Sequence, residues 1–145
     1  MKRYVRFICL TLVFAMALAL PVAAESVNQR ASNYFATYGA YFDHVSGNNY
    51  EIWFDVTAVG WMDELGVKSI TLKRSTDEVN WSTVGTYSMS DYSQMVNKNG
   101  AVTHVGNVDC TCVPGYYYVA FVELYAKDGN STATMTIWTT TLDLT

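Results

Sequence analysis

The stretch from Tyr50 to Ala58 alternates apolar and polar side chains, and this alternation constrains the fold more than any other feature of the chain. Successive side chains of an extended strand point to opposite faces, so a period of two gives one face to a core and the other to water. Turn-forming residues bound the stretch, with Gly47 to Asn49 before it and Gly60 after it. The pattern predicts a β-strand whose core-facing side chains are Tyr50, Ile52, Phe54, Val56 and Ala58.

Six further segments are rich in β-forming residues and are separated by turns. Asp128 to Asn130, between the last two of them, is a tight hairpin signal. The first segment also suits one face of a helix, because Tyr34, Tyr38 and Tyr41 recur at helical spacing, so that alternative stays open. The six expected strands are Ser32 to Phe42, Val67 to Arg74, Trp81 to Met89, Ala101 to Cys110, Tyr116 to Ala126 and Ser131 to Leu142.

Seven short strands at this spacing predict an all-β fold. Their count and rhythm are typical of an antiparallel immunoglobulin/fibronectin III-like sandwich, and a small closed barrel is the main competitor. No internal repeat and no low-complexity linker divides the chain, so we expect a single β-sandwich domain over residues 25–145.

Residues 1–24 have the order of a secretory signal peptide. Lys2, Arg3 and Arg6 form a basic start, the uncharged run Phe7 to Leu20 follows, and small residues precede a cut after Ala24. The apolar run is too short to cross a bilayer comfortably, where about 20 residues are needed, although an uncleaved anchor is the alternative. The pattern predicts a secreted protein that leaves the membrane once it is cleaved.

The charge balance excludes two classes of partner. Three of the nine basic residues precede the expected cut, so six Lys and Arg face all thirteen Asp and Glu, a net charge of −7. Nucleic-acid binding needs clustered Lys and Arg against the phosphates, and anionic lipid needs the same sign of charge. We therefore expect no nucleic-acid partner and no attachment to anionic lipid.

Two cysteines, Cys110 and Cys112, follow the expected cut. On a regular strand their side chains share one face with the sulfur atoms too far apart to bond. A local disulfide therefore requires a turn, which Pro114 and Gly115 favour, and free thiols are the alternative. Metal binding is disfavoured, because tetrahedral sites need three or four ligands and only His44 and His104 could join the two thiols.

The stretch Pro114 to Ala120 resembles the start of the sixth strand of fibronectin type III domains, with a Pro-Gly turn followed by tyrosines. The resemblance implies that Tyr118 is a corner tyrosine whose hydroxyl bonds to the backbone, which is a structural role. It covers about a quarter of the chain after the expected cut.

In layout the chain is also similar to small secreted proteins of unknown function from Gram-positive bacteria. That resemblance implies secretion and a single domain, and it implies no activity. The segments that carry it are Arg30 to Tyr34, Met62 to Gly66 in a middle loop, Ser75 to Trp81, and Pro114 to Tyr118.

Ser75 to Trp81 resembles the Asp-box hairpin of sialidase-like propellers, with Val79 where glycine is expected and Trp81 one residue early. In such a hairpin the aspartate caps the turn and the tryptophan plugs it. We therefore expect Asp77 and Trp81 to be structural, and one copy cannot form a propeller, which needs at least four blades.

No set of residues predicts catalysis or a cofactor. Glycoside hydrolysis needs two carboxylates across the scissile bond, and the spacing of Asp55, Asp63, Glu64 and Glu123 does not indicate that they converge. A histidine and a cysteine could in principle act as base and nucleophile, but no flanking signature supports this pairing. We expect a protein that is not an enzyme.

Exposed aromatic side chains are the remaining candidates for a binding site. Trp53 falls on the face of its strand opposite the apolar set, between Glu51 and Asp55, and Trp61 falls in the loop expected after Gly60. Aromatic rings beside carboxylates can stack on sugars or anchor a protein partner. The alternative is that these rings only pack against neighbouring side chains within the sandwich. We predict a secreted binding module for a surface glycan or protein. The alternatives are a small extracellular hydrolase and a structural protein that self-associates through an edge strand such as Ser131 to Leu142.

Overall fold

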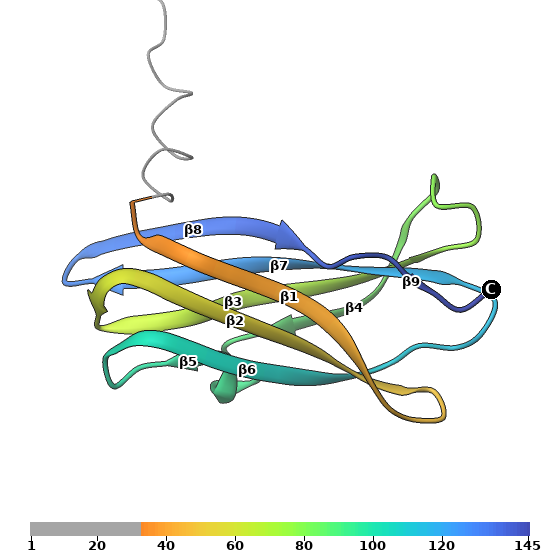
Figure 1. Cartoon of the computed structure of the whole chain (residues 1–145), viewed down its shortest axis with the longest axis horizontal. Helices are drawn as coiled ribbons and strands as arrows, with labels where there is room; N and C mark the ends of the chain where they lie inside the picture. The colour runs from red at the N-terminus through yellow and green to blue at the C-terminus, as the bar shows by residue number, and fades with distance from the viewer. Residues whose placement is uncertain (1–32) are drawn as a thin grey trace, which may run out of the picture.

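The computed structural model describes residues 33–145, which form two antiparallel β-sheets packed against each other (Figure 1). Sheet A has three strands in the order β1-β2-β6, which are β1 (Phe35–Ser46), β2 (Asn49–Met62) and β6 (Ala101–Thr111). Sheet B has the order β4-β3-β7-β8, and its strands are β3 (Glu64–Ser75), β4 (Ser82–Ser88), β7 (Tyr117–Asp128) and β8 (Ser131–Trp138). The predicted all-β sandwich is confirmed.

Three short elements complete the described part of the chain. The 3-10 turn η1 (Ser93–Met95) leads into β5 (Val96–Asn97), which pairs with β3. Near the C-terminus β9 (Leu142–Asp143) pairs with β7. Residues 33–145 thus contain seven strands of seven residues or more and two strands of two residues.

The core lies between the two sheets and is formed by alternate residues of their strands. In β2, Ile52, Phe54 and Val56 are fully buried, as the alternation predicts. Sheet B meets them with the fully buried Ile70, Val122 and Leu124. Removing these apolar surfaces from water is the main stabilising contribution to such a fold, at about 25 cal/mol per Å².

The strand boundaries differ from expectation in four places. The middle loop expected over Met62 to Gly66 is wrong, because β2 runs to Met62 and β3 begins at Glu64. The tyrosine-rich first segment is a strand, so the helical alternative is wrong, and it continues to Ser46. Trp61 lies within β2, which runs through Met62, so the expectation of a loop there is wrong. β8 ends at Trp138, because Thr139 leaves the strand and bonds to Ala120 through both its amide and its hydroxyl, at 3.0 and 3.1 Å.

One residue, Asp63, carries the chain from sheet A to sheet B. Its amide donates to the carbonyl of Lys127 at 2.8 Å, and its carboxylate accepts the amide of Gly129 at 2.7 Å. These bonds tie the β2–β3 corner to the β7–β8 turn at one end of the sandwich. The β1–β2 turn and the β3–β4 loop lie at the opposite end (Figure 1).

The predicted signal peptide, residues 1–24, lies outside the residues that the structure describes. Between positions 33 and 145, no helix has the length and apolar character required to cross a lipid bilayer.

Candidate binding face

The outer face of sheet A brings aromatic, acidic, amide and hydroxyl side chains together on three adjacent strands. The antiparallel register places Tyr41 of β1, Trp53 of β2 and Asn107 of β6 in one row across the sheet. We call this surface the acidic–aromatic face, and its residues are Tyr41, Asp43, Glu51, Trp53, Asp55, Thr57, Thr103, Val105, Asn107 and Asp109.

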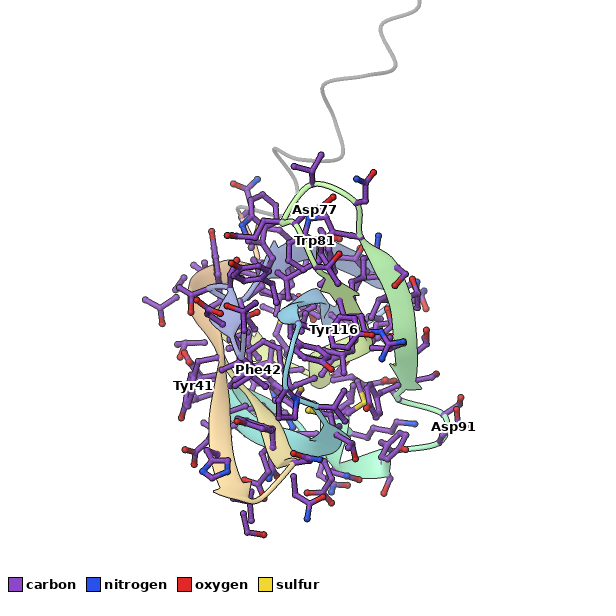
Figure 2. The ribbon with its side chains drawn as sticks, turned by 90° about the vertical axis from the view of Figure 1, so that its right-hand side faces the viewer. Tyr41, Phe42, Asp77, Trp81, Asp91 and Tyr116 are labelled. Carbon is purple, nitrogen blue, oxygen red and sulfur yellow. The ribbon has the colours of Figure 1, made fainter. Side chains whose placement is uncertain are left out.

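Trp53 and Tyr41 form the aromatic part of this face. Trp53 is half-buried, and its indole Nε1 donates a hydrogen bond to Glu51 Oε2 at 2.7 Å, which fixes the ring along the strand. Tyr41, its register partner, is 50 % exposed. In Figure 2 Tyr41 points away from the body of the molecule, whereas its neighbour Phe42 points toward the interior. The sequence prediction for Trp53 therefore identifies one member of a cross-strand pair.

A row of three carboxylates borders the aromatic pair. Asp43, Glu51 and Asp109 are consecutive register partners across β1, β2 and β6. Like charges directly opposite each other destabilise a sheet. Within the described residues, the strands of sheet A contain no Lys or Arg that could compensate them.

The other side of the aromatic pair carries Asp55 and a set of threonines. A Cβ atom at Gly39 would lie 2.7 Å from Asp55 Oδ1, so the glycine leaves room for this carboxylate to lie over β1. One row further along, the hydroxyls of Thr57 and Thr103 are 3.2 Å apart. The face thus presents hydrogen-bonding groups on both sides of two aromatic rings.

Trp61 lies eight residues further along β2 than Trp53, at most about 26 Å away, because the register with β6 shifts between Thr57 and Met62. It is 66 % exposed. The ring packs on Gly100, where an added Cβ would come within 2.6 Å of Trp61 Cζ2, and Gly100 has a φ of +81° that favours glycine. The second predicted tryptophan is therefore held against backbone at the far end of the strand.

A groove of about 600 Å³ continues the acidic–aromatic face beyond β6. It is lined on one side by Val105 and Asn107 of β6 and on the other by the η1–β5 segment and the loop after it. Asn97 and Asn99 add two further amide side chains there, and Lys98 between them adds a cation. Sequence reasoning did not identify this groove, because it depends on how the η1–β5 segment lies beside β6.

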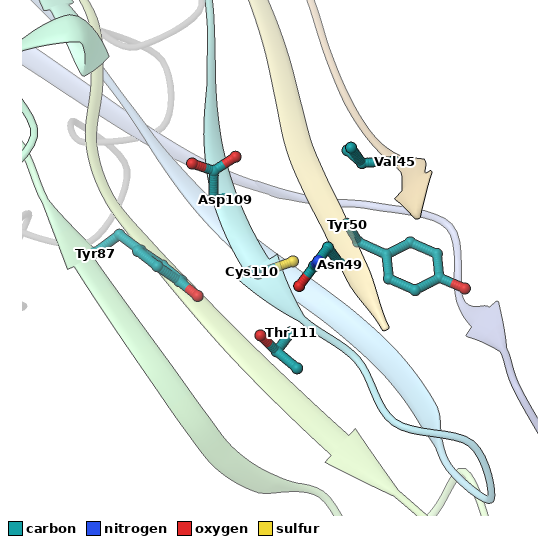
Figure 3. A pocket seen from close by; sticks show the side chains of 7 residues that line it. All are labelled: Val45, Asn49, Tyr50, Tyr87, Asp109, Cys110 and Thr111. Carbon is teal, nitrogen blue, oxygen red and sulfur yellow. The ribbon is translucent and has the colours of Figure 1, made fainter. Parts of the chain in front are cut away.

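A second groove, of about 460 Å³, lies at the end of the sandwich beside Cys110 (Figure 3). Tyr50, Tyr87 and Asp109 line it together with this thiol. Tyr87 belongs to β4 and Tyr50 to β2, so both sheets contribute to its walls. Burial, with smaller effects of Cys110 and Tyr92, raises the pKa of Tyr87 to about 12.

Cys110 and Cys112 are both buried free thiols, with their Sγ atoms 4.0 Å apart. Cys110 is the penultimate residue of β6, and Cys112 follows the strand and donates its amide to the carbonyl of Asn48 at 2.9 Å. Their side chains share one face, as the spacing predicts. The hydrogen bond between the sulfurs lowers the pKa of the Cys110 thiol and raises that of Cys112.

Asp77 organises the β3–β4 loop. Its carboxylate accepts hydrogen bonds from the amides of Val79 and Asn80 at 2.9 and 2.8 Å, and also from the Asn80 side chain and the Ser75 hydroxyl. The backbone bond from Asn80 is the largest of several that hold the pKa of Asp77 well below its usual range. Trp81 Nε1 donates to the carbonyl of Glu78 at 3.0 Å. Both side chains therefore form hydrogen bonds to the backbone of their own loop.

Tyr118 occupies the start of β7 and is buried. Its hydroxyl accepts a hydrogen bond from the amide of Val113 at 2.9 Å and donates to the carbonyl of the same residue at 3.3 Å. These are the backbone contacts implied by a corner tyrosine.

The carboxylates considered for hydrolysis are divided between two sides of the molecule. Asp55 lies on the outer face of sheet A, whereas Glu123 lies on sheet B, where it accepts hydrogen bonds from Lys68 and Ser69. Glu64 pairs with Lys127, and Asp63 is bonded to Gly129. These contacts do not form a pair of carboxylates across a common cleft.

The two histidines bond to backbone carbonyls. His44 Nε2 is 3.0 Å from the oxygen of Gly47, and His104 Nε2 is 2.9 Å from that of Gln94. Tyr50 lies between His44 and Cys110 in the register, which separates the imidazole from the thiol by a strand. In residues 33–145 no group of three or more His, Cys, Asp or Glu is arranged to hold a metal ion.

Comparison with known proteins finds no family model, no curated protein and no solved structure that matches this chain. The acidic–aromatic face is therefore interpreted from its own geometry. Sequence reasoning missed Tyr41, Asp43, Asn107 and Asp109 as neighbours of Trp53. The Gly47-Asn48 turn indicates that β1 and β2 form a hairpin, but it does not give the register that places Tyr41 and Asp43 beside Trp53.

Proposed function

We propose that this protein is a non-enzymatic extracellular binding module that holds an extended polysaccharide on the outer face of sheet A. The observation that carries the proposal is the cross-strand pair of Tyr41 and Trp53, flanked by three carboxylates on one side and by Asp55 and threonine hydroxyls on the other. Aromatic rings bind the apolar faces of sugar rings, and ring hydroxyls donate to carboxylates and amide oxygens.

The shape of the face supports a long ligand. Trp53 and Trp61 mark two points on one strand, at most about 26 Å apart, with Asp55 and Thr57 between them. The hydrogen bond from Trp53 to Glu51 and the packing of Trp61 on Gly100 hold both rings before a ligand arrives. Such preorganisation reduces the entropy lost on binding.

The charge of the face selects among polysaccharides. Four carboxylates lie on it, and among the described residues its three strands carry no Lys or Arg, while Lys98 lines the adjoining groove. Like charges across an interface cost binding free energy, so acidic polysaccharides are disfavoured. Neutral and amino-sugar chains are the compatible classes.

Affinity measurements with three polysaccharides test the proposal, namely chitosan fragments, a neutral β-glucan and polygalacturonate. We expect binding of the amino-sugar or neutral chain and none of the acidic one. Trp53→Ala should weaken binding by about 30-fold, the effect of losing a central aromatic contact worth about 2 kcal/mol.

Trp138→Ala is the matched control, because Trp138 is 67 % exposed on the outer face of sheet B. It should leave the affinity unchanged. Equal losses in the two variants, or binding of polygalacturonate alone, would contradict the proposed face. Binding of a protein and none of the three glycans would point to the protein-binding alternative.

We also propose the fibronectin III-like form of the sandwich. The corner geometry of Tyr118 at the start of the sixth long strand supports it. So does the strand order, because the fourth long strand, β4, pairs with β3 rather than joining the sheet of the first two strands.

Export with cleavage near Ala24 remains part of this proposal, and its support is the basic, apolar and small-residue order of the first 24 residues. N-terminal sequencing of protein recovered from the culture medium would identify the cut.

A further inference from the structure

Two thiols lie side by side at the end of the sandwich where β6 leaves sheet A. The Sγ atoms of Cys110 and Cys112 are 4.0 Å apart, and the two residues are 6 % and 0 % exposed. Only Cys110 lines the groove at this end, together with Tyr50, Tyr87 and Asp109 (Figure 3). The pair is therefore asymmetric, with one sulfur at the groove and the other enclosed in the core.

The distance between the sulfurs is within reach of a bond. A disulfide has its sulfur atoms about 2.05 Å apart, so the pair has to close by about 2 Å. Cys112 lies just beyond the last residue of β6 and shortly before the Pro114-Gly115 turn, where Gly115 has a φ of +89°. The backbone here is held by hydrogen bonds from the Cys112 amide to Asn48 and between Val113 and Tyr118, so we expect the shift to come mainly from rotation of the two cysteine side chains.

We propose that Cys110 and Cys112 are an exchangeable dithiol–disulfide pair that reacts with external disulfides through the groove. In the first step the Cys110 thiolate attacks one sulfur of an external disulfide. A bond forms between Cys110 and that sulfur, and the other half leaves as a thiolate that takes up a proton. In the second step the Cys112 thiolate attacks Cys110 Sγ and releases the remaining half as a second thiol. The two cysteines lose two electrons, and the external disulfide is reduced to two thiols.

The roles of the two sulfurs follow from their surroundings. Of the two thiols only Cys110 lines the groove, and the hydrogen bond between the sulfurs, in which either thiol can donate, lowers the pKa of Cys110 and raises that of Cys112. The thiolate is the attacking species in such exchange, so Cys110 reacts first. Cys112, with no exposed surface, meets only the mixed disulfide formed beside it.

The bond is exchangeable rather than structural because it stabilises the fold little. It would close a ring of three residues, and the entropy removed from the unfolded chain by a disulfide falls with the length of the loop. The extended backbone of β6 also holds the sulfurs apart, and a bond that opposes its backbone geometry is reduced more readily.

Oxidation by glutathione tests the pair. The folded full-length chain is incubated with oxidised glutathione and then with an excess of reduced glutathione, quenched with acid, alkylated and digested with trypsin. Cleavage after Lys98 and Lys127 releases one peptide, residues 99–127, that contains both thiols and excludes Cys9. We expect this peptide to lose two hydrogens and its alkylation sites on oxidation, and to regain both on reduction.

Single substitutions assign the two sulfurs. Cys112→Ala should retain one glutathione on Cys110, whereas Cys110→Ala should acquire none while it remains folded. A peptide that is alkylated at both cysteines in every mixture would overturn the proposal. So would an internal bond that excess reduced glutathione cannot open, or glutathione bound to Cys112 in Cys110→Ala. If a variant no longer has the circular dichroism spectrum of the folded protein, the unsubstituted chain still tests the first two outcomes, which are complete alkylation and an irreducible bond.

Discussion

The two outer faces of the sandwich cover the same core but differ in whether their charged side chains are paired. On sheet A, Asp43, Glu51 and Asp109 lie opposite one another with no cation on their strands. On sheet B, Lys68 pairs with Glu123 at 3.2 Å and Lys127 with Glu64 at 2.8 Å. We call the outer surface of sheet B the paired-charge face.

The aromatic side chains differ in the same way. On the paired-charge face Lys73 Nζ lies 4.9 Å from the centre of the Phe121 ring, and that ring is 6.3 Å from Trp138. On the acidic–aromatic face the Tyr41 and Trp53 pair has acidic neighbours and no cation within its strands. One face satisfies its own charges, whereas the other retains a repulsive arrangement that a sheet does not need for stability. This contrast supports the proposal that the acidic–aromatic face binds a ligand.

The largest expected effect comes from substitutions in the hydrophobic core that lies beneath both faces. Phe54→Ala removes core beneath the acidic–aromatic face, and Leu124→Ala removes core beneath the paired-charge face; both side chains are fully buried. We expect losses of about 3–5 and 2–5 kcal/mol in the free energy of unfolding, each in a single transition. Urea unfolding followed by circular dichroism and tryptophan fluorescence measures this. Two separate transitions in either variant would mean that the sheets are stabilised independently.

Charge reversal on each face should give effects of opposite sign. Asp109→Lys places a cation opposite Glu51 and should stabilise the protein by about 0.5 kcal/mol, whereas Glu123→Lys removes the partner of Lys68 and Ser69 and should destabilise it by about 1 kcal/mol. Asp109→Asn is the control that separates relief of repulsion from the gain of a new pair. Changes of the same sign in the two reversals, measured by thermal unfolding, would remove the contrast between the faces.

The smallest expected effect is a change of folding stability at alkaline pH, caused by the Lys127–Glu64 pair on the paired-charge face. The hydrogen bond to Glu64 raises the pKa of Lys127 above its ordinary value of 10.5. A cation with a raised pKa stabilises the folded state fully below the unfolded value and loses this contribution as the pH rises through the folded value. The stability difference between the wild type and Lys127→Gln should therefore be constant up to about pH 10 and narrow above 10.5. A difference that stays constant through this range would show that the pair contributes nothing.

Much of the fold could be predicted from the sequence. Alternation in residues 50–58 identified the buried set Ile52, Phe54 and Val56, because strand geometry sends every second side chain to the same side. The seven segments correspond to the seven long strands, and β8 is an edge strand of sheet B. The ends of the strands were harder to predict from the sequence, since Trp61 was expected in a loop and lies within β2.

The candidate site could be predicted only in part. Trp53 was found because it alternates with the core residues of its own strand. Its register partner Tyr41 was not found, because a bulge between His44 and Ser46 shifts the register of β1 and β2 by one residue. Continued without the bulge, the Ser46–Asn49 pairing would place Tyr41 opposite Phe54, on the core side, instead of opposite Trp53.

The sequence by itself determined which side chains of each strand face the same way, because this follows from the local geometry of an extended chain. It also determined the turn chemistry that holds Asp77 in the β3–β4 loop, because those bonds join residues at most three apart. Only the tertiary structure decided which strands are neighbours, and therefore that three carboxylates form one row and that a single thiol reaches a groove. Pairings between residues far apart in the chain depend on register and on the packing of both sheets, which no local pattern specifies.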